Sequence, residues 1–473
     1  MNTRMRNWRR FRSVTLLHLS LGFLVTGALA QTTLSTVGLC GQFDRIQDAI
    51  DAVVVGKDTE IRVQGDATYL ENLLFPNSFM AGSIELTGGW DCSFLAQNGD
   101  PSSTVIDGSD ADSVARIRLG GGALVIGGFT VTRGRADKGA GIQVLLAGDA
   151  ALVLENLWVV DNLATSPGAV LGGGVSAELH GYESVDIRGL LIENNQAISS
   201  GPAAVYGGGL SMIASDSSRF RVEDCVVQGN RIESGGGNVL GGGIHLETRH
   251  SVQGELLDSR VSENIATGDL EIATGIHARS LQSSTLAVER TNLRLNSSDG
   301  MGSGPQLWVS VHTTSTLWVR DSGATWGDFR GVYARAHDTG QIHLTNLTVA
   351  DNEEIGLHLS VCESGMISLY NTISFGNTVE AEMDPSVDAG VNLIGIDPLF
   401  VDAAGSDYHL ELGSPGINSG DNEPPGGLGA ADLDRAPRVI EGIVDIGMYE
   451  TAGVLFSDGF ESGDCGAWSL EVP

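Results

Sequence analysis

Residues 207–230 read GGGLSMIASDSSRFRVEDCVVQGN, and residues 241–264 read GGGIHLETRHSVQGELLDSRVSEN. Both stretches open on a glycine run followed by an aliphatic residue and close on an aliphatic-x-x-Asn word. The Asn words of the chain end at Asn162, Asn195, Asn230, Asn264 and Asn296, with steps of 33, 35, 34 and 32 residues. The first words lead into Val175, Leu210, Ile244 and Ile276. A unit copied at a nearly constant period indicates a solenoid.

Apolar residues alternate with polar ones after each first word, as at Ile244 and Leu246. This period of two predicts a strand whose apolar side chains face inward. Two further short strands follow in each copy, with no helix between them. Each strand must therefore pair with its counterpart in the next copy. Because parallel crossovers are almost always right-handed, we expect an all-β fold, a right-handed parallel β-helix.

The two words have conformational explanations. Glycine allows a tight bend with positive φ before the first strand. Asparagine tolerates positive φ at the bend that follows it, and stacked amides can hydrogen-bond from coil to coil. Both columns are therefore interpreted as structural and not as ligand-binding.

Residues 43–55, FDRIQDAIDAVVV, carry apolar side chains at helical spacing. We expect this amphipathic helix to cap the open end of the solenoid. The predicted organisation has a signal peptide, a cap with the first coils, β-helix repeats, terminal coils and a tail. Their ranges are 1–30, 31–115, 116–380, 381–450 and 451–473.

The first thirty residues combine five arginines, an apolar stretch and the small-x-small word at residues 28–30, which predicts a signal peptide cleaved before Gln31. The full chain has 27 basic and 59 acidic residues, so removal of the five arginines changes the net charge from −32 to 22 − 59 = −37. Such acidity disfavours nucleic acid and anionic lipid as partners. No later stretch is long enough for a transmembrane helix. We therefore expect the protein to be exported and to have no cofactor. An acidic surface would suit a calcium-containing exterior, but no sequence motif supports a metal site.

Five cysteines occur without metal-type spacing. Cys40 and Cys92 flank the predicted helix and are the expected disulfide. Cys225 aligns with Leu157 and Leu190 of other copies, which predicts a buried residue. Cys465 is expected to be free or externally paired.

The two words resemble the GGA-I and F-x-x-N repeats of the polymorphic outer membrane proteins. The likeness continues in LTGGWDCSF and TVIDG, between Leu86 and Gly108. Four later words resemble the choice-of-anchor Q module of secreted β-helix proteins. They are DPLF at 397–400, YHLELGSPGINSG at 408–420, DLDRAPR at 432–438 and VDIGMYE at 444–450.

The chain departs from that module at Gly416, Asn418 and Arg435, and the last departure speaks against a calcium loop at Asp432 and Asp434. Both resemblances imply an exported protein of the bacterial cell surface or outer membrane. The end of the chain, residues 455–473, is either a sorting tag or an edge-covering strand.

The register also predicts an outward column on the first strand of each copy. It contains Gln143, Ser176, Ser211, His245, His277, Trp308, Tyr333 and His358. At about 4.8 Å per coil the column is roughly 34 Å long. Its rings are candidates for stacking on sugars, with His245, His277, Trp308, Tyr333 and His358 as the binding ladder. Alternatively, they are ordinary stabilising pairs of a parallel sheet.

Beside this column, His245, Glu247, His277 and Arg279 should form a square on two adjacent coils. A carboxylate with imidazoles and a guanidinium could perform acid-base chemistry on a polysaccharide. The plainer interpretation is a cross-strand salt bridge. The predicted fold resembles that of pectate-lyase-like enzymes, but their clustered aspartates with a catalytic arginine, and the galacturonase-like Asp-Asp and Gly-His-Gly words, are missing from the sequence.

These observations favour a secreted or surface-displayed β-helix protein, adhesin-like or a scaffold, that binds glycan or another surface polymer through a lateral face. The alternative is a polysaccharide lyase or glycoside hydrolase that acts on an acidic polysaccharide.

Overall fold

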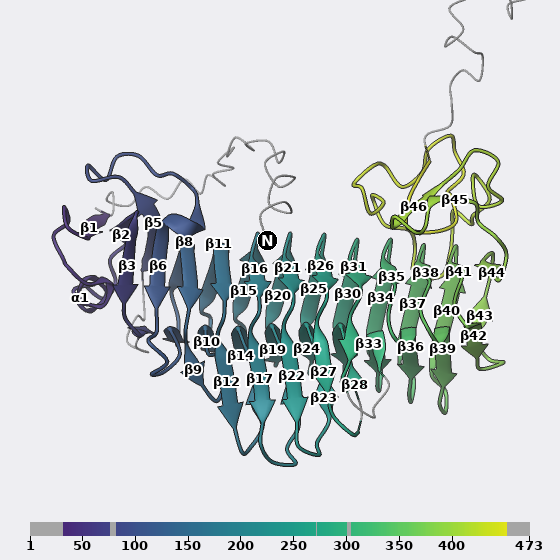
Figure 1. The fold of residues 1–473 in the computed structure, drawn as a ribbon, viewed down its shortest axis with the longest axis horizontal. Helices are drawn as coiled ribbons and strands as arrows, with labels where there is room; N and C mark the ends of the chain where they lie inside the picture. The colour runs from purple at the N-terminus through teal and green to yellow at the C-terminus, as the bar shows by residue number, and fades with distance from the viewer. Residues whose placement is uncertain (1–31, 76–81, 271, 300–303, 452–473) are drawn as a thin grey trace, which may run out of the picture. The chain divides into compact units, whose positions relative to one another are not determined.

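A computed structural model describes residues 32–75, 82–270, 272–299 and 304–451, and these described residues form one compact unit. The chain is a right-handed parallel β-helix, as predicted, in which strands stack from coil to coil (Figure 1). The expected signal peptide and Cys465 lie outside the described residues, as does the tail beyond Thr451.

The first strand of each coil belongs to an 11-stranded parallel sheet. Its strands are β4 (Leu73–Phe75), β7 (Ala115–Leu119), β10 (Ile142–Gly148), β14 (Val175–Gly181), β19 (Leu210–Ser215), β24 (Ile244–Thr248), β29 (Ile276–Ser280), β33 (Pro305–Val311), β36 (Arg330–Ala336), β39 (Ile355–Val361) and β42 (Val379–Met383). Its inward side chains pack in register, as Leu246 does on Ala278, and both are fully buried. Burial of a side chain such as Leu246 stabilises the fold by about 1.5–3 kcal/mol.

The second and third strands of the coils form two columns of a 23-stranded sheet. The second-strand column contains β1 (Thr33–Val37), β2 (Thr59–Gln64), β5 (Ser83–Trp90), β8 (Ala123–Thr132), β11 (Ala151–Val160), β15 (Ser184–Arg188), β20 (Arg219–Glu223), β25 (Gln253–Leu257), β30 (Thr285–Glu289), β34 (Thr316–Arg320), β37 (Gln341–Thr345), β40 (Met366–Tyr370) and β43 (Asp388–Ala389). The third-strand column contains β3 (Ala67–Leu70), β6 (Thr104–Asp107), β16 (Leu191–Glu193), β21 (Val226–Gln228), β26 (Arg260–Ser262), β31 (Asn292–Arg294), β35 (Gly323–Thr325), β38 (Thr348–Ala350), β41 (Ile373–Phe375) and β44 (Leu393–Ile394).

The glycine runs serve the backbone, as expected. Gly241 has φ +80°, and a Cβ there would overlap the carbonyl oxygen of Ile244. A Cβ on the next residue, Gly242, would overlap the carbonyl oxygen of Thr274 in the following coil. The run therefore provides both a positive-φ bend and a close approach between coils.

The asparagines form a buried amide ladder. The Nδ2 of Asn195 donates to the Oδ1 of Asn230 at 3.0 Å, and Asn230 donates in the same way to Asn264 at 2.9 Å. All three side chains are fully buried. These contacts confirm the predicted hydrogen bonds between amides of successive coils. They also satisfy amide groups that would otherwise be costly to bury.

The position of the positive-φ residue differs from the prediction. The left-handed residue precedes each asparagine, at Asp161, Asn194, Gly229, Glu263 and Leu295. The asparagines themselves stay out of this region because their amides are held inside by the ladder.

In one coil, the glycine and the amide side chain exchange their positions. In most coils a glycine lies against the asparagine amide: a Cβ on Gly275, for example, would come within 3.0 Å of the Nδ2 of Asn296. In the coil of β33 and β35, Gln306 replaces the glycine and Gly327 occupies the asparagine position. Gln306 accepts from Asn296 Nδ2 at 3.2 Å and donates to Asn352 Oδ1 at 2.8 Å. Its amide therefore keeps the ladder continuous where the sequence pattern lapses.

The N-terminal end is covered by helix α1 (Ile46–Asp51), which is shorter than the predicted helix over 43–55. Ile46 and Ile50 pack into the core. The buried Glu71 carboxylate accepts hydrogen bonds from the backbone N–H groups of Ile46 and Gln47 at 2.8 and 3.0 Å, an arrangement that stabilises the start of the helix. Cys40 and Cys92 form a disulfide, and Cys225 is buried and free.

Lateral loops project between the Asn word and the next glycine run. Their strands form a six-stranded sheet and a four-stranded sheet with a small apolar core of their own. The first sheet contains β9 (Arg135–Ala136), β12 (Leu163–Ser166), β17 (Gln196–Ser199), β22 (Arg231–Ser234), β27 (Ile265–Thr267) and β32 (Ser297–Ser298). The second contains β13 (Val170–Leu171), β18 (Val205–Tyr206), β23 (Val239–Leu240) and β28 (Ile272–Ala273).

The C-terminal segment corrects the expectation of terminal coils over 381–450. Parallel coils end at β44, and an antiparallel hairpin of β45 (Phe400–Asp402) and β46 (Asp407–Leu410) follows. The chain then folds back over the 23-stranded sheet (Figure 1). Tyr408 and Met448 pack against Ala350 because the outward positions of the later third strands are small or apolar.

Candidate functional site

The predicted ladder residues share one column of the 11-stranded sheet. His245 pairs in register with His277, His277 with Trp308, Trp308 with Tyr333, and Tyr333 with His358. The order of the column is therefore the predicted one, although its exposure is not uniform.

The first half of the column is covered. His245 is 0% exposed and His277 is 5% exposed. The ring of Tyr206, from the lateral loops, lies 4.9 Å from the ring of His245. Ser176 and Ser211 are buried as well. This burial corrects the expectation of one continuous exposed row.

The two buried histidines contact each other. Their Nδ1 atoms are 3.0 Å apart, and their rings stack with centroids separated by 5.0 Å. Burial, assisted by Arg279 and Arg249, lowers the pKa of His245 to about 3. Burial, with His245 and Arg279, also holds the pKa of His277 well below its usual value. Both rings are therefore neutral at physiological pH, and one can donate its Nδ1–H to the other.

The proposed catalytic square is only partly assembled. Glu247 lies in register with Arg279, but it is 4% exposed and its carboxylate pairs with Arg249, which directly follows β24. Arg279 is partly exposed and forms no ion pair among the described residues. A polymer has no access to three of the four side chains, so the arrangement does not favour acid-base chemistry on a polysaccharide.

The second half of the column is open, because the lateral loops end at β32. Trp308, Tyr333 and His358 are partly exposed. Neighbouring rings lie 5.2 and 4.9 Å apart and meet edge to face, at 65° and 70°. These three rings are therefore tilted against one another and do not lie in parallel planes, and edge-to-face contact is one of the two arrangements that aromatic pairs favour.

Cationic and imidazole side chains flank the open rings. Arg335 follows Tyr333 on the same face of β36 and contacts the Sγ of Cys362 at 3.8 Å. Beyond it the rings of His312 and His337 stack at 4.3 Å. Burial, followed by the nearby arginines, lowers the pKa of both imidazoles. Arg335, like Arg279, forms no ion pair within the described part of the chain.

In the residues that the structure describes, no group of three or more His, Cys, Asp or Glu side chains is arranged to hold a metal ion. The same residues contain no helix of the length and hydrophobicity required to span a bilayer.

The length of the segment between each Asn word and the next first strand indicates which part of the ladder column is covered. The repeat words themselves do not contain this information. The segment from Asn264 to the strand at Ile276 is long enough for a loop, whereas Asn352 is followed closely by the strand at Ile355. Comparison of these lengths separates the covered copies from the open ones.

No family model matches the sequence, and no curated protein matches it either. The likeness to polymorphic outer membrane proteins and to the choice-of-anchor module therefore stays a prediction. Among solved structures, the chain is similar to pectate lyase Pel9A, at 14% identity and a TM-score of 0.42, over 89% of this chain and 96% of that one. It is also similar to pectin methylesterase from carrot, at 12% identity and a TM-score of 0.32, over 60% of this chain and 82% of the other.

Proposed function

We propose that this protein binds an extended glycan on the outer face of β33, β36 and β39, as an adhesin or scaffold outside the cell. The observation that carries the proposal is the partly exposed row of Trp308, Tyr333 and His358, placed where the lateral loops end. Aromatic side chains at the coil repeat can contact successive apolar sugar faces. Arg279 and Arg335 can donate hydrogen bonds to hydroxyl or carboxylate groups beside them.

Substitution of the central rings tests the proposal. In affinity electrophoresis against immobilised neutral and acidic polysaccharides, we expect Trp308→Ala and Tyr333→Ala each to weaken retention about tenfold, which corresponds to about 1.4 kcal/mol. Trp318→Ala is the matched control, because Trp318 is a partly exposed aromatic of the 23-stranded sheet. Equal retention of the wild type and both ladder variants would overturn the proposal.

The same incubations distinguish binding from cleavage. Retention without new reducing or unsaturated ends supports a binding protein. Release of such ends, if abolished by Glu247→Gln, would instead support a polysaccharide lyase or hydrolase that acts through His245, Glu247, His277 and Arg279. Ends that persist in Glu247→Gln would place any cleavage elsewhere.

Location outside the cell is part of the proposal and rests on residues 1–30. Fractionation of cells that express the full chain should recover it from the exterior or the outer membrane, and removal of residues 1–30 should retain it inside. A second truncation, without residues 455–473, distinguishes an anchored protein from a released one.

A further inference from the structure

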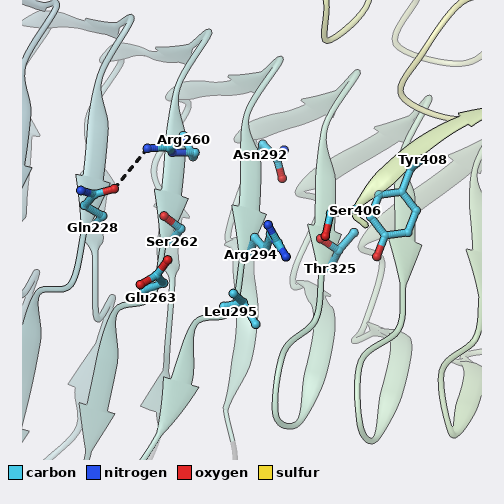
Figure 2. Close-up of a pocket in the computed structure, with 10 residues that line it drawn as sticks. All are labelled: Gln228, Arg260, Ser262, Glu263, Asn292, Arg294, Leu295, Thr325, Ser406 and Tyr408. Carbon is cyan, nitrogen blue, oxygen red and sulfur yellow. Dashed lines mark hydrogen bonds between the residues drawn. The ribbon is translucent and has the colours of Figure 1, made fainter. Parts of the chain in front are cut away.

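A cavity of about 210 Å³ lies where the folded-back segment crosses the 23-stranded sheet. Figure 2 shows its wall, formed by side chains of successive coils together with Ser406 and Tyr408. It is remote from the ladder, which belongs to the 11-stranded sheet.

The cavity results from a change in side-chain size along the third-strand column. Asn292 pairs in register with Gly323, and Arg294 pairs with Thr325. The smaller partners leave space beside Arg294. The hairpin covers this space, and Tyr408 is held there by a hydrogen bond from its hydroxyl to Asp351 at 2.8 Å.

Three side chains of the wall hold a buried polar atom that has no hydrogen-bond partner in the structure. They are the Nε of Arg294, the Oδ1 of Asn292 and the Oγ of Ser406. Buried donors and acceptors are normally satisfied, so a donor, an acceptor and a hydroxyl left open around one cavity indicate a polar occupant.

The charges of the wall favour an anion. Arg260 and Arg294 form no ion pair among the described residues, and Arg260 donates only to the amide oxygen of Gln228 at 3.1 Å. Glu263 is the one acidic residue of the wall and is exposed to solvent. Both guanidiniums are therefore available to an anionic group of a ligand.

We propose that this cavity is a binding site for a hydroxy-carboxylate, either an acidic sugar residue at the end of a glycan or a free sugar acid. The carboxylate would receive hydrogen bonds from the guanidiniums of Arg260 and Arg294, since guanidinium groups match the geometry of carboxylates. Hydroxyl groups would donate to Asn292 Oδ1 and pair with Ser406. The site is additional to the ladder and does not depend on it.

Titration calorimetry on the purified chain tests the site. The probes are glucuronate, its methyl glycoside and open-chain gluconate, with glucose and acetate as comparisons. We expect saturable binding of one equivalent of a hydroxy-carboxylate, with glucose and acetate at least tenfold weaker. Binding of the glycoside identifies a glycan end, and binding of gluconate alone identifies a free sugar acid. No saturable binding of any hydroxy-carboxylate would overturn the proposal.

Variants locate the ligand. Arg294→Gln should weaken binding at least tenfold and Ser406→Ala a fewfold, whereas Arg219→Gln, an exposed arginine of the same sheet, should bind as the wild type does. If Arg294→Gln fails to fold, Asn292→Asp replaces it. This substitution puts a negative charge beside the ligand carboxylate at nearly constant side-chain size, and it should likewise weaken binding at least tenfold. Unchanged affinity in a folded Arg294→Gln or Asn292→Asp variant would overturn the proposal. If Trp308→Ala abolished binding of these small sugar acids, the proposal would also be overturned, because Trp308 belongs to the ladder and not to this cavity.

Discussion

The guanidinium of Arg438 lies 3.5 Å from the carboxylate of Asp321, and the two side chains are 1% and 0% exposed. Arg438 belongs to the segment that folds back over the coils, and Asp321 belongs to the coils themselves. The same guanidinium lies 3.2 Å from Glu450 and donates to the carbonyl oxygens of Asp445 and Gly447 at 2.9 and 3.0 Å. A buried cation therefore joins the C-terminal segment to the β-helix.

Arg438→Met should destabilise the protein by about 3–5 kcal/mol, because it leaves two buried carboxyl groups without their cation. The measurement is the free energy of unfolding from urea denaturation. Arg435→Gln is the control: Arg435 pairs with Asp224 and Asp258 across the same junction but is 54% exposed. Its loss should cost no more than about 1 kcal/mol. Equal losses in the two variants would contradict the assignment of Arg438 as the main contact.

Stability should fall as the pH rises toward 8. Burial, partly offset by Arg438, raises the pKa of Asp321 to about 7 and that of Glu450 to about 7. Their contribution is fully present below the unfolded pKa values near 4 and is lost as the pH rises through about 7. Between pH 5 and 8 the wild type should lose on the order of a few kcal/mol relative to Asp321→Asn, whose amide does not titrate. Parallel pH profiles of the two proteins would refute this assignment.

Gln306 and Gly327 exchange the glycine and asparagine positions of a regular coil. We expect that the regular arrangement can be restored by substituting both residues together, but not by substituting either one alone. A Cβ on Gly327 would lie 2.8 Å from the Cγ of Gln306, so Gly327→Asn alone should clash, and Gln306→Gly alone should break the ladder. Each should cost at least about 2 kcal/mol. The double variant recreates the pair of a regular coil, and its free energy of unfolding should lie within about 1 kcal/mol of the wild type. A double-mutant cycle measures this coupling, and additive losses would disprove it.

Histidine NMR spectra recorded against pH test the covered half of the column. His245 and His277 should not titrate between pH 5 and 8, because burial holds their pKa values low. His409 should titrate above 6.5: burial lowers its pKa, but the carboxylates of Asp407 and Asp434 outweigh that effect and raise it. Tyr206→Ala should move the pKa of His245 toward its ordinary value. Titration of wild-type His245 near 6.5 would mean that the lateral loop stands open in solution.

The register of the ladder could be predicted because it depends on local alternation and on a fixed repeat between coils. The sequence therefore predicts that Trp308 and His358 share one column, although their copies lack the glycine run. Exposure could not be predicted in the same way, because the cover over His245 comes from Tyr206 in a segment without that alternation. The cavity beside Arg294 could not be predicted for a similar reason: the hairpin that covers it, with Ser406 and Tyr408, comes from a distant part of the sequence.

The amide ladder also has a direction. Every link donates Nδ2–H toward the C-terminal coils, from Asn162 to Asn377, so the dipoles of the amides add along the core. At the positive end, Asn377 donates to the carboxylate of Glu380 at 2.8 Å. An anion there complements the summed dipole as an acidic residue does at a helix N-terminus. The stack of coils is thus electrically polar along its axis, and a coil added beyond Asn377 would have to supply a new terminating anion.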